Sequence, residues 1–123
     1  MREAKDQSLW IGTGAGLSHY QNGHFTNFTQ KDGLTHEVVK TIMEDTQGYI
    51  WIGTDGGGLN RYANGKFSSF TTKDGLSNGY VWEIYQDREG SIWLGMYGGG
   101  LNRLREGKFL TYTTKEGLAN DHV

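Results

Sequence analysis

The sequence contains no cysteine and no proline among its 123 residues, and it has no long apolar run. Without cysteine, the chain can form neither a disulfide bond nor a thiolate metal site. No stretch approaches the roughly 18 consecutive apolar residues of a membrane-spanning helix, and the opening MREAKDQSLW lacks the apolar segment of a signal peptide. We therefore expect a soluble chain without membrane contact, which would be cytoplasmic as expressed.

An excess of positive charge is also missing. The chain carries 12 Lys and Arg against 14 Asp and Glu, a formal net charge of −2, and its basic residues are spread singly. Proteins that bind nucleic acids normally present a basic patch or stripe. We expect no nucleic-acid partner.

Glycine and aromatic residues are abundant instead. The sequence has 20 Gly together with 4 Trp, 7 Tyr and 5 Phe. Glycine-rich disordered chains usually contain few aromatic residues. The combination predicts many short strands, packed through aromatic side chains and separated by tight turns.

The sequence repeats itself about every 42 residues. Residues 48–81 and 90–123 are identical at 20 of 34 positions without a gap. One unit contains four strand-like stretches, at 36–44, 49–54, 57–63 and 66–71, and no stretch has a helical apolar period. Four short strands in about 42 residues are typical of a β-propeller blade. The predicted fold is all-β, with three four-stranded antiparallel blades; a β-solenoid is the alternative, although its coils are usually shorter.

The ends of the chain divide one blade between them. We predict a single propeller fragment over 1–123, with blade units at about 1–35, 36–77 and 78–119. In the repeat register Met1 matches Ile42 and Val123 matches Val39, so 118–123 and 1–13 share one split blade. Three blades do not close a ring easily, and open blade faces favour association. We expect head-to-tail self-assembly into a six-bladed homodimer first and a nine-bladed homotrimer second; the rival is a monomeric excerpt of a longer propeller.

The motif V-x-x-I-x-x-D-x-x-G-x-x-W-I-G-T-x-G-G-G-L-N-R-Y, which begins at Val39, resembles the repeat of the two-component regulator propeller family. The third unit repeats the motif from Val81 but departs from it at Met96 and Leu104. This resemblance implies a blade from the extracytoplasmic, or periplasmic, sensor region of a bacterial signalling protein. It also implies a glycan ligand. No kinase or other output module is visible in the sequence.

The glycine triplets do not predict a nucleotide site. A phosphate-binding loop needs G-x-x-x-x-G-K-[ST] before a helix, whereas GGG at 56–58 and 98–100 joins two strands. In the turns DTQG and DREG, Asp45 and Asp87 are expected to accept backbone hydrogen bonds. The aromatic residues that recur once per blade are expected to form the core: Trp10, Trp51, Trp93, Phe25, Phe67 and Phe109.

Ligand-binding residues are expected at positions where the repeats keep their backbone pattern but differ in the side chain. Lys40 and Trp82 are equivalent, as are Asp55 and Tyr97. Variable polar and aromatic groups on a constant frame are how a fold acquires a binding site. Aromatic rings could stack on sugars while polar groups bind hydroxyls; ordinary surface variation is the competing explanation. The predicted ligand-binding residues are Trp82, Tyr80, Tyr97, Asp55, Glu83, His36 and His122.

Three functions remain open at this point. The first is a non-catalytic binding or sensor module, for which oligosaccharide follows from the family resemblance alone. The second is a structural or engineered propeller fragment with no ligand of its own. The third is a polysaccharide lyase or glycosidase with a site between chains, for which Glu44 and Glu83 are conceivable carboxylates. Neither carboxylate lies in a local catalytic motif, so we expect no enzyme activity, no catalytic residue, no cofactor and no metal site.

Overall fold

The computed structural model describes residues 2–5, 7–36, 38–76, 78–98, 100–105 and 108–112, which form three four-stranded antiparallel sheets. Blade one contains β1 (Arg2–Glu3), β2 (Leu9–Thr13), β3 (Gly16–Gln21) and β4 (His24–Phe28). Blade two contains β5 (Val39–Glu44), β6 (Ile50–Thr54), β7 (Leu59–Ala63) and β8 (Lys66–Phe70). Blade three contains β9 (Val81–Gln86), β10 (Ile92–Met96), β11 (Gly100–Arg105) and β12 (Lys108–Tyr112).

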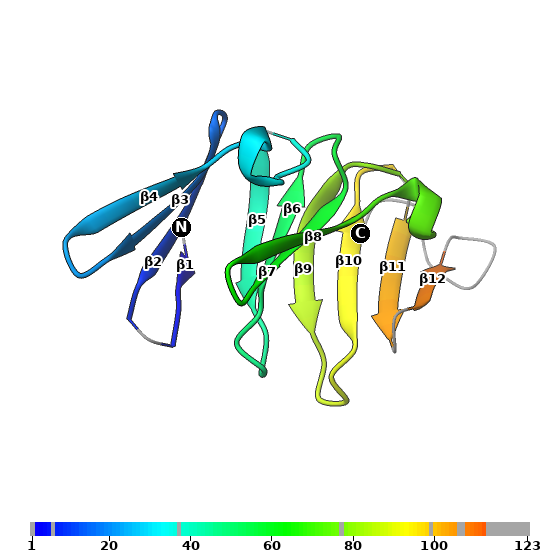
Figure 1. Ribbon diagram of the computed structural model, residues 1–123. Helices are drawn as coiled ribbons and strands as arrows, with labels where there is room; N and C mark the ends of the chain where they lie inside the picture. Colours follow the sequence, from blue (N-terminus) through cyan, green and yellow to red (C-terminus); the bar gives the residue numbers. More distant parts are fainter. Residues whose placement is uncertain are drawn as a thin grey trace.

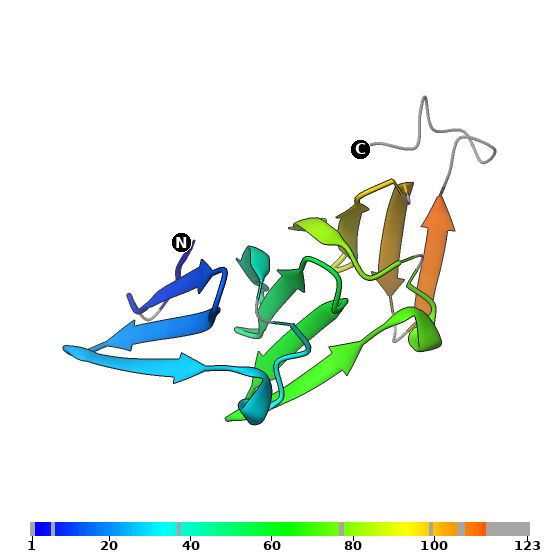
Figure 2. The ribbon, with the colours of Figure 1, turned by 90° about the horizontal axis from the view of Figure 1, so that it is seen from above.

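Within each blade every strand pairs with its neighbour in the chain. Figures 1 and 2 show the three sheets side by side, like the blades of a fan. The predicted all-β fold of four-stranded antiparallel blades is confirmed. In the middle unit the predicted strand ends differ from the observed ones by at most three residues.

The hairpin between the third and fourth strands follows from an Asn-Gly pair. Asn22 and Asn64 both have φ of 53°, and Gly23 and Gly65 that follow them have φ of 81° and 79°. Positive φ at both central residues defines the type I′ turn, whose twist matches that of the paired strands. The short sequences QNG and ANG therefore fix where the two outer strands of blades one and two turn back.

The blades are joined by two short 3₁₀ helices with the same local sequence. They are η1 (Gln30–Asp32) and η2 (Thr72–Asp74). In η1, Thr29 Oγ1 accepts the Lys31 amide and the Asp32 carboxylate accepts the Thr29 amide, which forms a capping box. Each helix ends on a glycine and is followed by a buried leucine, Leu34 or Leu76. The linker is thus a structural part of each repeat.

The hydrophobic core lies between neighbouring blades. One cluster joins blades one and two, and a larger one joins blades two and three. The first cluster contains Ala4, Trp10, Leu17, Leu34, Ile50 and Ile52. The second contains Met43, Trp51, Leu59, Leu76, Val81, Ile92, Leu94, Met96 and Leu104. Each blade therefore needs a neighbour to bury its apolar face, as in other repeat folds.

The repeated tryptophans differ in burial according to their position in the row. Trp10 and Trp51 each face the following blade and are 3% exposed. Trp93 lies on the outer side of blade three, meaning the face that no other blade covers in the described structure, and is only half-buried.

The repeated phenylalanines face the opposite way, toward the preceding blade. The Phe67 ring lies 5.3 Å from the Phe28 ring of blade one, and the Phe109 ring lies 5.8 Å from the Phe70 ring of blade two. Phe25 is the exception, with 63% of its surface exposed. The prediction that Phe25 belongs to the core is wrong for the single chain, because no blade covers that side within the described residues.

Candidate functional site

The first strands of blades two and three, β5 and β9, each contain a bulge at the same position. In β5, Val39 pairs with Thr54 and Thr41 pairs with Gly53, which leaves Lys40 as an extra residue. In β9, Trp82 is the extra residue in the same way. A bulge redirects the side chain of the residue it contains. Lys40 and Trp82 are consequently presented at the same end of their blades.

Three aromatic rings gather at this end of blade three. The Trp82 and Tyr97 rings stack with centroids 4.5 Å apart and planes inclined by 30°. The Tyr80 ring meets the Tyr97 ring edge-on at 6.3 Å. The exposed fractions of Tyr80, Trp82 and Tyr97 are 44%, 40% and 52%. Large aromatic side chains that pack on one another and remain this exposed form a candidate binding surface.

Two charged residues of blade two complete the group, which we call the Trp82 cluster: Lys40, Asp55, Tyr80, Trp82 and Tyr97. Trp82 Nε1 donates a hydrogen bond of 3.1 Å to Asp55 Oδ1. The Lys40 ammonium lies 5.2 Å from the centroid of the Trp82 ring. The cluster thus combines a carboxylate, an ammonium group and three rings, drawn from two blades.

Backbone hydrogen bonds fix the loops that carry the cluster. Asp55 forms an isolated antiparallel bridge with Tyr80, and the Tyr97 amide donates to the Tyr80 carbonyl at 3.1 Å. Asn78 donates its side-chain amide to the Tyr97 carbonyl at 3.0 Å and accepts the Tyr80 amide at 2.8 Å. These bonds hold the rings in position before any ligand arrives, which reduces the entropy cost of binding.

His36 lies beside the cluster. Its Nδ1 accepts the Val38 amide at 3.0 Å. A Cβ atom added to Gly56 would lie 3.6 Å from His36 Nε2 and 3.7 Å from Tyr80 Cε1, so this glycine separates the two rings. The structure therefore places His36 at the edge of the same surface.

The structure does not bring every predicted site residue together. Glu83 lines the outer, apolar side of blade three with Tyr85 and Trp93, away from the Trp82 cluster. Glu44 lines the groove between blades one and two, so Glu44 and Glu83 do not share a pocket. His122 lies outside the described residues.

Lys40 and Asn78 also contribute to this surface, although neither is among the ligand-binding residues predicted from the sequence. The repeat alignment could have identified Lys40, because Lys40 occupies the same position in its repeat as Trp82. Nothing in the sequence marks Asn78, since its role depends on a contact with a loop 19 residues away.

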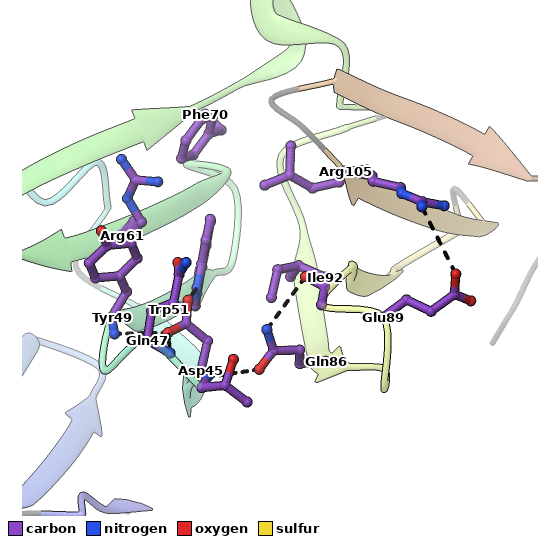
Figure 3. Close-up of a pocket in the computed structure, with 13 residues that line it drawn as sticks. Asp45, Gln47, Tyr49, Trp51, Arg61, Phe70, Gln86, Glu89, Ile92 and Arg105 are labelled. Carbon is purple, nitrogen blue, oxygen red and sulfur yellow. Dashed lines mark hydrogen bonds and ion pairs between the residues drawn. The ribbon is translucent and has the colours of Figure 1, made fainter.

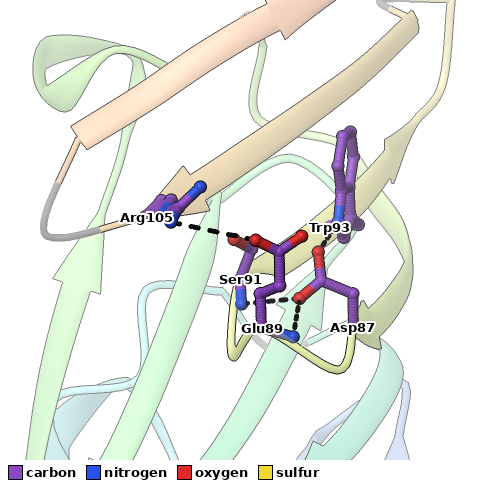
Figure 4. Close-up of polar contacts among 5 residues, drawn as sticks. All are labelled: Asp87, Glu89, Ser91, Trp93 and Arg105. Atoms are coloured by element: carbon purple, nitrogen blue, oxygen red, sulfur yellow. Dashed lines mark hydrogen bonds and ion pairs between the residues drawn. The ribbon is translucent and has the colours of Figure 1, made fainter.

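The aspartates at the opposite end of the blades have the structural role that was expected. Asp87 Oδ1 accepts the amides of Glu89 and Ser91 at 2.9 and 3.0 Å, and Oδ2 accepts Trp93 Nε1 at 2.7 Å (Figure 4). The hydrogen bond from the Trp93 indole, helped by the two amides, lowers the pKa of Asp87. Asp45 makes the same three bonds in blade two.

Two segments of the chain, residues 33–56 and 75–98, match the profile of the family described as two component regulator propeller. The chain carries two-component regulator propeller repeats. The matched segments run from the glycine that ends a 3₁₀ linker to the loop after the second strand of a blade. They contain the bulged strand, the aspartate turn, the repeated tryptophan and all five residues of the Trp82 cluster. No curated protein sequence matches the chain significantly.

Solved structures of bacterial extracellular domains share this fold. The extracellular domain of BT3049, assigned to the hybrid two component systems of B. thetaiotaomicron, matches 98% of the chain with a TM-score of 0.87 and 22% identity. The extracellular domain of BT4673 from the same organism matches 98% with a TM-score of 0.78 and 20% identity. The chain spans 19% of the length of each of these domains.

In the described part of the chain, no helix has the length and apolar character needed to cross a membrane. The same residues contain no group of three or more His, Cys, Asp or Glu side chains placed to hold a metal ion.

Proposed function

We propose that this chain is a non-catalytic, ligand-binding part of a sensor propeller, and that its ligand is an oligosaccharide bound at the Trp82 cluster. The exposed, stacked Trp82–Tyr97 pair beside the Asp55 carboxylate is the observation that carries this proposal. Flat apolar faces bordered by a few fixed polar groups are typical of small-molecule sites. Ring faces would stack on the sugar, and the Asp55 carboxylate would accept hydrogen bonds from its hydroxyl groups.

Lys40 has a specific part in this proposal. Tyr97 covers one side of the Trp82 ring, and the Lys40 ammonium lies over the ring as well. Lysine has a long, flexible side chain, and an exposed cation–π contact contributes only about 0.5–1 kcal/mol. A sugar could therefore displace the lysine at small cost and use the ring face beneath it.

Similarity to the sensor domains supports the cellular setting of the proposal. BT3049 and BT4673 are represented by their extracellular domains. We place this chain outside the cytoplasm by the same reasoning, as part of a signal-receiving region. Glu44 and Glu83 line different pockets, so a single chain does not present them together as the carboxylate pair that glycoside hydrolysis needs.

The test is a glycan array followed by tryptophan-fluorescence titration of the strongest binder. Trp82→Ala and Tyr97→Ala should each weaken binding by about tenfold or more, the usual loss for an aromatic anchor. Lys40→Ala should keep or strengthen the binding of a neutral glycan. Tyr85→Ala, measured at a concentration at which the chain is monomeric, is the matched control, because Tyr85 is an aromatic residue of the same strand with 66% exposure and lies outside the cluster.

Three outcomes would contradict the proposal. Binding that survives both Trp82→Ala and Tyr97→Ala would place the site elsewhere. The absence of any glycan binder would favour a propeller fragment without a ligand of its own. Cleavage of a polysaccharide by the purified chain would favour the lyase or glycosidase alternative.

We also propose that two copies associate head to tail to form a six-bladed ring. The outer side of blade three carries Trp93 and Leu101 where blade two carries Trp51 and Leu59, which are buried against blade three. The outer side of blade one carries the exposed Phe25. A second copy would repeat the blade contact already present twice within the chain, a heterologous interface that closes.

Solution mass tests this assembly. At 13.8 kDa per chain, the six-bladed dimer has a mass of about 28 kDa and the nine-bladed trimer about 41 kDa. Phe25→Asp should convert the assembly into monomers without unfolding them. A wild-type chain that stays monomeric at high concentration would overturn the proposal.

A further inference from the structure

A second candidate site lies in the groove between blades two and three (Figure 3). Its volume is about 610 Å³, which is within the range of small-molecule pockets. We call it the Arg61 groove. Its lining includes Tyr49, Trp51, Arg61 and Phe70 from blade two, and Ile92, Leu104 and Arg105 from blade three.

The guanidinium group of Arg61 is held among aromatic rings. Its Cζ atom lies 5.2 Å from the centroid of Tyr49, 5.6 Å from that of Trp51 and 5.9 Å from that of Phe70. Its Nε is buried and has no hydrogen-bond partner, and no carboxylate of the described residues forms an ion pair with it. Guanidinium groups keep their charge, and ring faces compensate only part of the lost hydration. The groove therefore offers a positive charge that an anion could neutralise.

The two carboxylates in the groove are occupied by other groups. Asp45 accepts two backbone amides at 2.9 Å and Trp51 Nε1 at 2.8 Å. Glu89 lies 3.9 Å from Arg105 Nη2, on the blade-three side. Both carboxylates have partners other than Arg61, so an incoming carboxylate would supply the missing one.

The groove between blades one and two provides an internal comparison. The same strand-end contact occurs in both grooves: Glu44 Oε1 accepts the Lys5 amide at 2.8 Å, and Gln86 Oε1 accepts the Thr46 amide at 2.9 Å. The two grooves nevertheless differ in size, because the groove between blades one and two has a volume of about 190 Å³.

Two side-chain differences account for this contrast. Tyr62 stands where the Arg61 groove has Leu104, and its ring lies 5.3 Å from the Trp10 ring and fills the space. His19, stacked on Trp10 at 4.0 Å, stands where the Arg61 groove has Arg61. The Arg61 groove is thus larger, and it has a guanidinium group where the groove between blades one and two has the His19 ring.

We propose that the Arg61 groove binds a small molecule that carries a carboxylate on a flat, apolar body. The terminal N–H groups of Arg61 would donate to the carboxylate, a planar match that lysine does not offer. The body of the ligand would lie against Phe70 on one wall and against Ile92 and Leu104 on the other. This site is separate from the Trp82 cluster and does not depend on the function proposed there.

Benzoate and benzamide are the probes, because they share a shape and differ in charge. In ¹⁵N NMR spectra of the wild-type chain, benzoate should shift the signals of Arg61 Nε–H and Trp51 Nε1–H in a saturable way. Benzamide should bind at least about tenfold more weakly, as expected for the loss of a charge-assisted hydrogen bond. Equal affinity for the two probes, or no saturable shift with benzoate, would overturn the proposal.

Three variants locate the site. Arg61→Met keeps an apolar stem and removes the charge, and Leu104→Tyr introduces the residue that fills the other groove while leaving Arg61 intact. Each should reduce benzoate affinity by about tenfold or more. Arg103→Met is the matched control: Arg103 stacks on Trp93 at 5.3 Å at the equivalent position of blade three and does not line this groove. It should leave the affinity unchanged.

The backbone spectra of all three variants establish that each is folded. If Arg61→Met is unfolded, Leu104→Tyr decides the question, because it keeps the arginine and its ring contacts. Wild-type benzoate affinity in folded Leu104→Tyr would refute binding in the groove. Wild-type affinity in folded Arg61→Met would show that Arg61 has only a structural role.

Discussion

Substitution of Gly53 by alanine tests the close packing between blades two and three. Gly53 lies in β6, where this blade meets the first strand of the next one. A Cβ atom at this position would lie 2.6 Å from Thr41 Cγ2, 2.8 Å from Val81 Cγ1 and 2.8 Å from the Val81 carbonyl oxygen. All three separations are shorter than normal van der Waals contacts, so the blades would have to move apart.

Overpacking of a well-packed interior typically costs about 1–3 kcal/mol. We expect Gly53→Ala to lie at the upper end of that range, about 3 kcal/mol, because one of the three contacts is with backbone. This is a large fraction of the roughly 5–15 kcal/mol by which domains are usually stable. Urea unfolding measures the loss as a lower midpoint with an unchanged slope.

A combined variant shows which contact matters. Thr41→Ser and Val81→Ala in the Gly53→Ala background remove the two side-chain contacts and leave the carbonyl oxygen in place. We therefore expect the triple variant to recover only part of the stability lost in Gly53→Ala, once the cost of Thr41→Ser and Val81→Ala in the wild-type background has been subtracted. Gly14→Ala is the control, because a Cβ at Gly14 would have no neighbour within 4 Å; its effect should stay within about 0.5 kcal/mol. A wild-type midpoint for Gly53→Ala would refute the close blade contact.

Three further substitutions probe other parts of the fold. Asn60 in β7 is 0% exposed; its side chain accepts the Thr35 amide and donates to Thr35 Oγ1, which ties the linker before β5 to this strand. Asn60→Ala should therefore lower the free energy of unfolding by about 2 kcal/mol. An unchanged urea midpoint would argue against those hydrogen bonds. The Trp93 indole lowers the pKa of Asp87 in the folded state, so this carboxylate stabilises the fold above its unfolded pKa of about 3.9 and the contribution is lost as pH falls through the folded value. Acid titration of Asp87→Asn should therefore show a smaller loss of stability below about pH 4 than wild type, and parallel curves would contradict this. In dilute solution, Phe25→Ala should change stability by less than about 0.5 kcal/mol while Phe67→Ala costs about 2 kcal/mol, because only Phe67 packs on another blade; equal losses in thermal or urea unfolding would contradict that placement.

Local sequence was sufficient to predict the blade itself. The strand-like stretches of each repeat predicted the strands, Asp45 and Asp87 were expected to accept backbone amides in their turns, and the Asn-Gly pairs explain the hairpins. Each of these features depends on residues within a few positions of one another. Such short-range preferences are visible in one sequence without knowledge of the rest of the fold.

The candidate sites could be predicted only in part. Aligning the repeats selected Asp55, Tyr80, Trp82 and Tyr97, which the structure brings together. The same comparison placed Glu83 with them, although its side chain lies on the outer side of blade three. A bulge at Trp82 shifts the strand register by one residue and changes which side chain turns toward the cluster. Repeat alignment alone does not reveal that shift.

The sequence by itself determined the repeat, the strands, the turns and the residues that vary from blade to blade. Tertiary structure decided which of those residues meet, because contacts between blades join positions about 40 residues apart. Phe25 and Phe67 occupy the same position in their repeats. Phe25 is exposed because, in the described structure, a neighbouring blade covers only Phe67. Arg61 faces an open groove because Leu104, on the next blade, is smaller than the tyrosine at the equivalent place. The burial of a side chain and the size of a groove depend on two neighbouring blades together, so neither can be predicted from a single repeat.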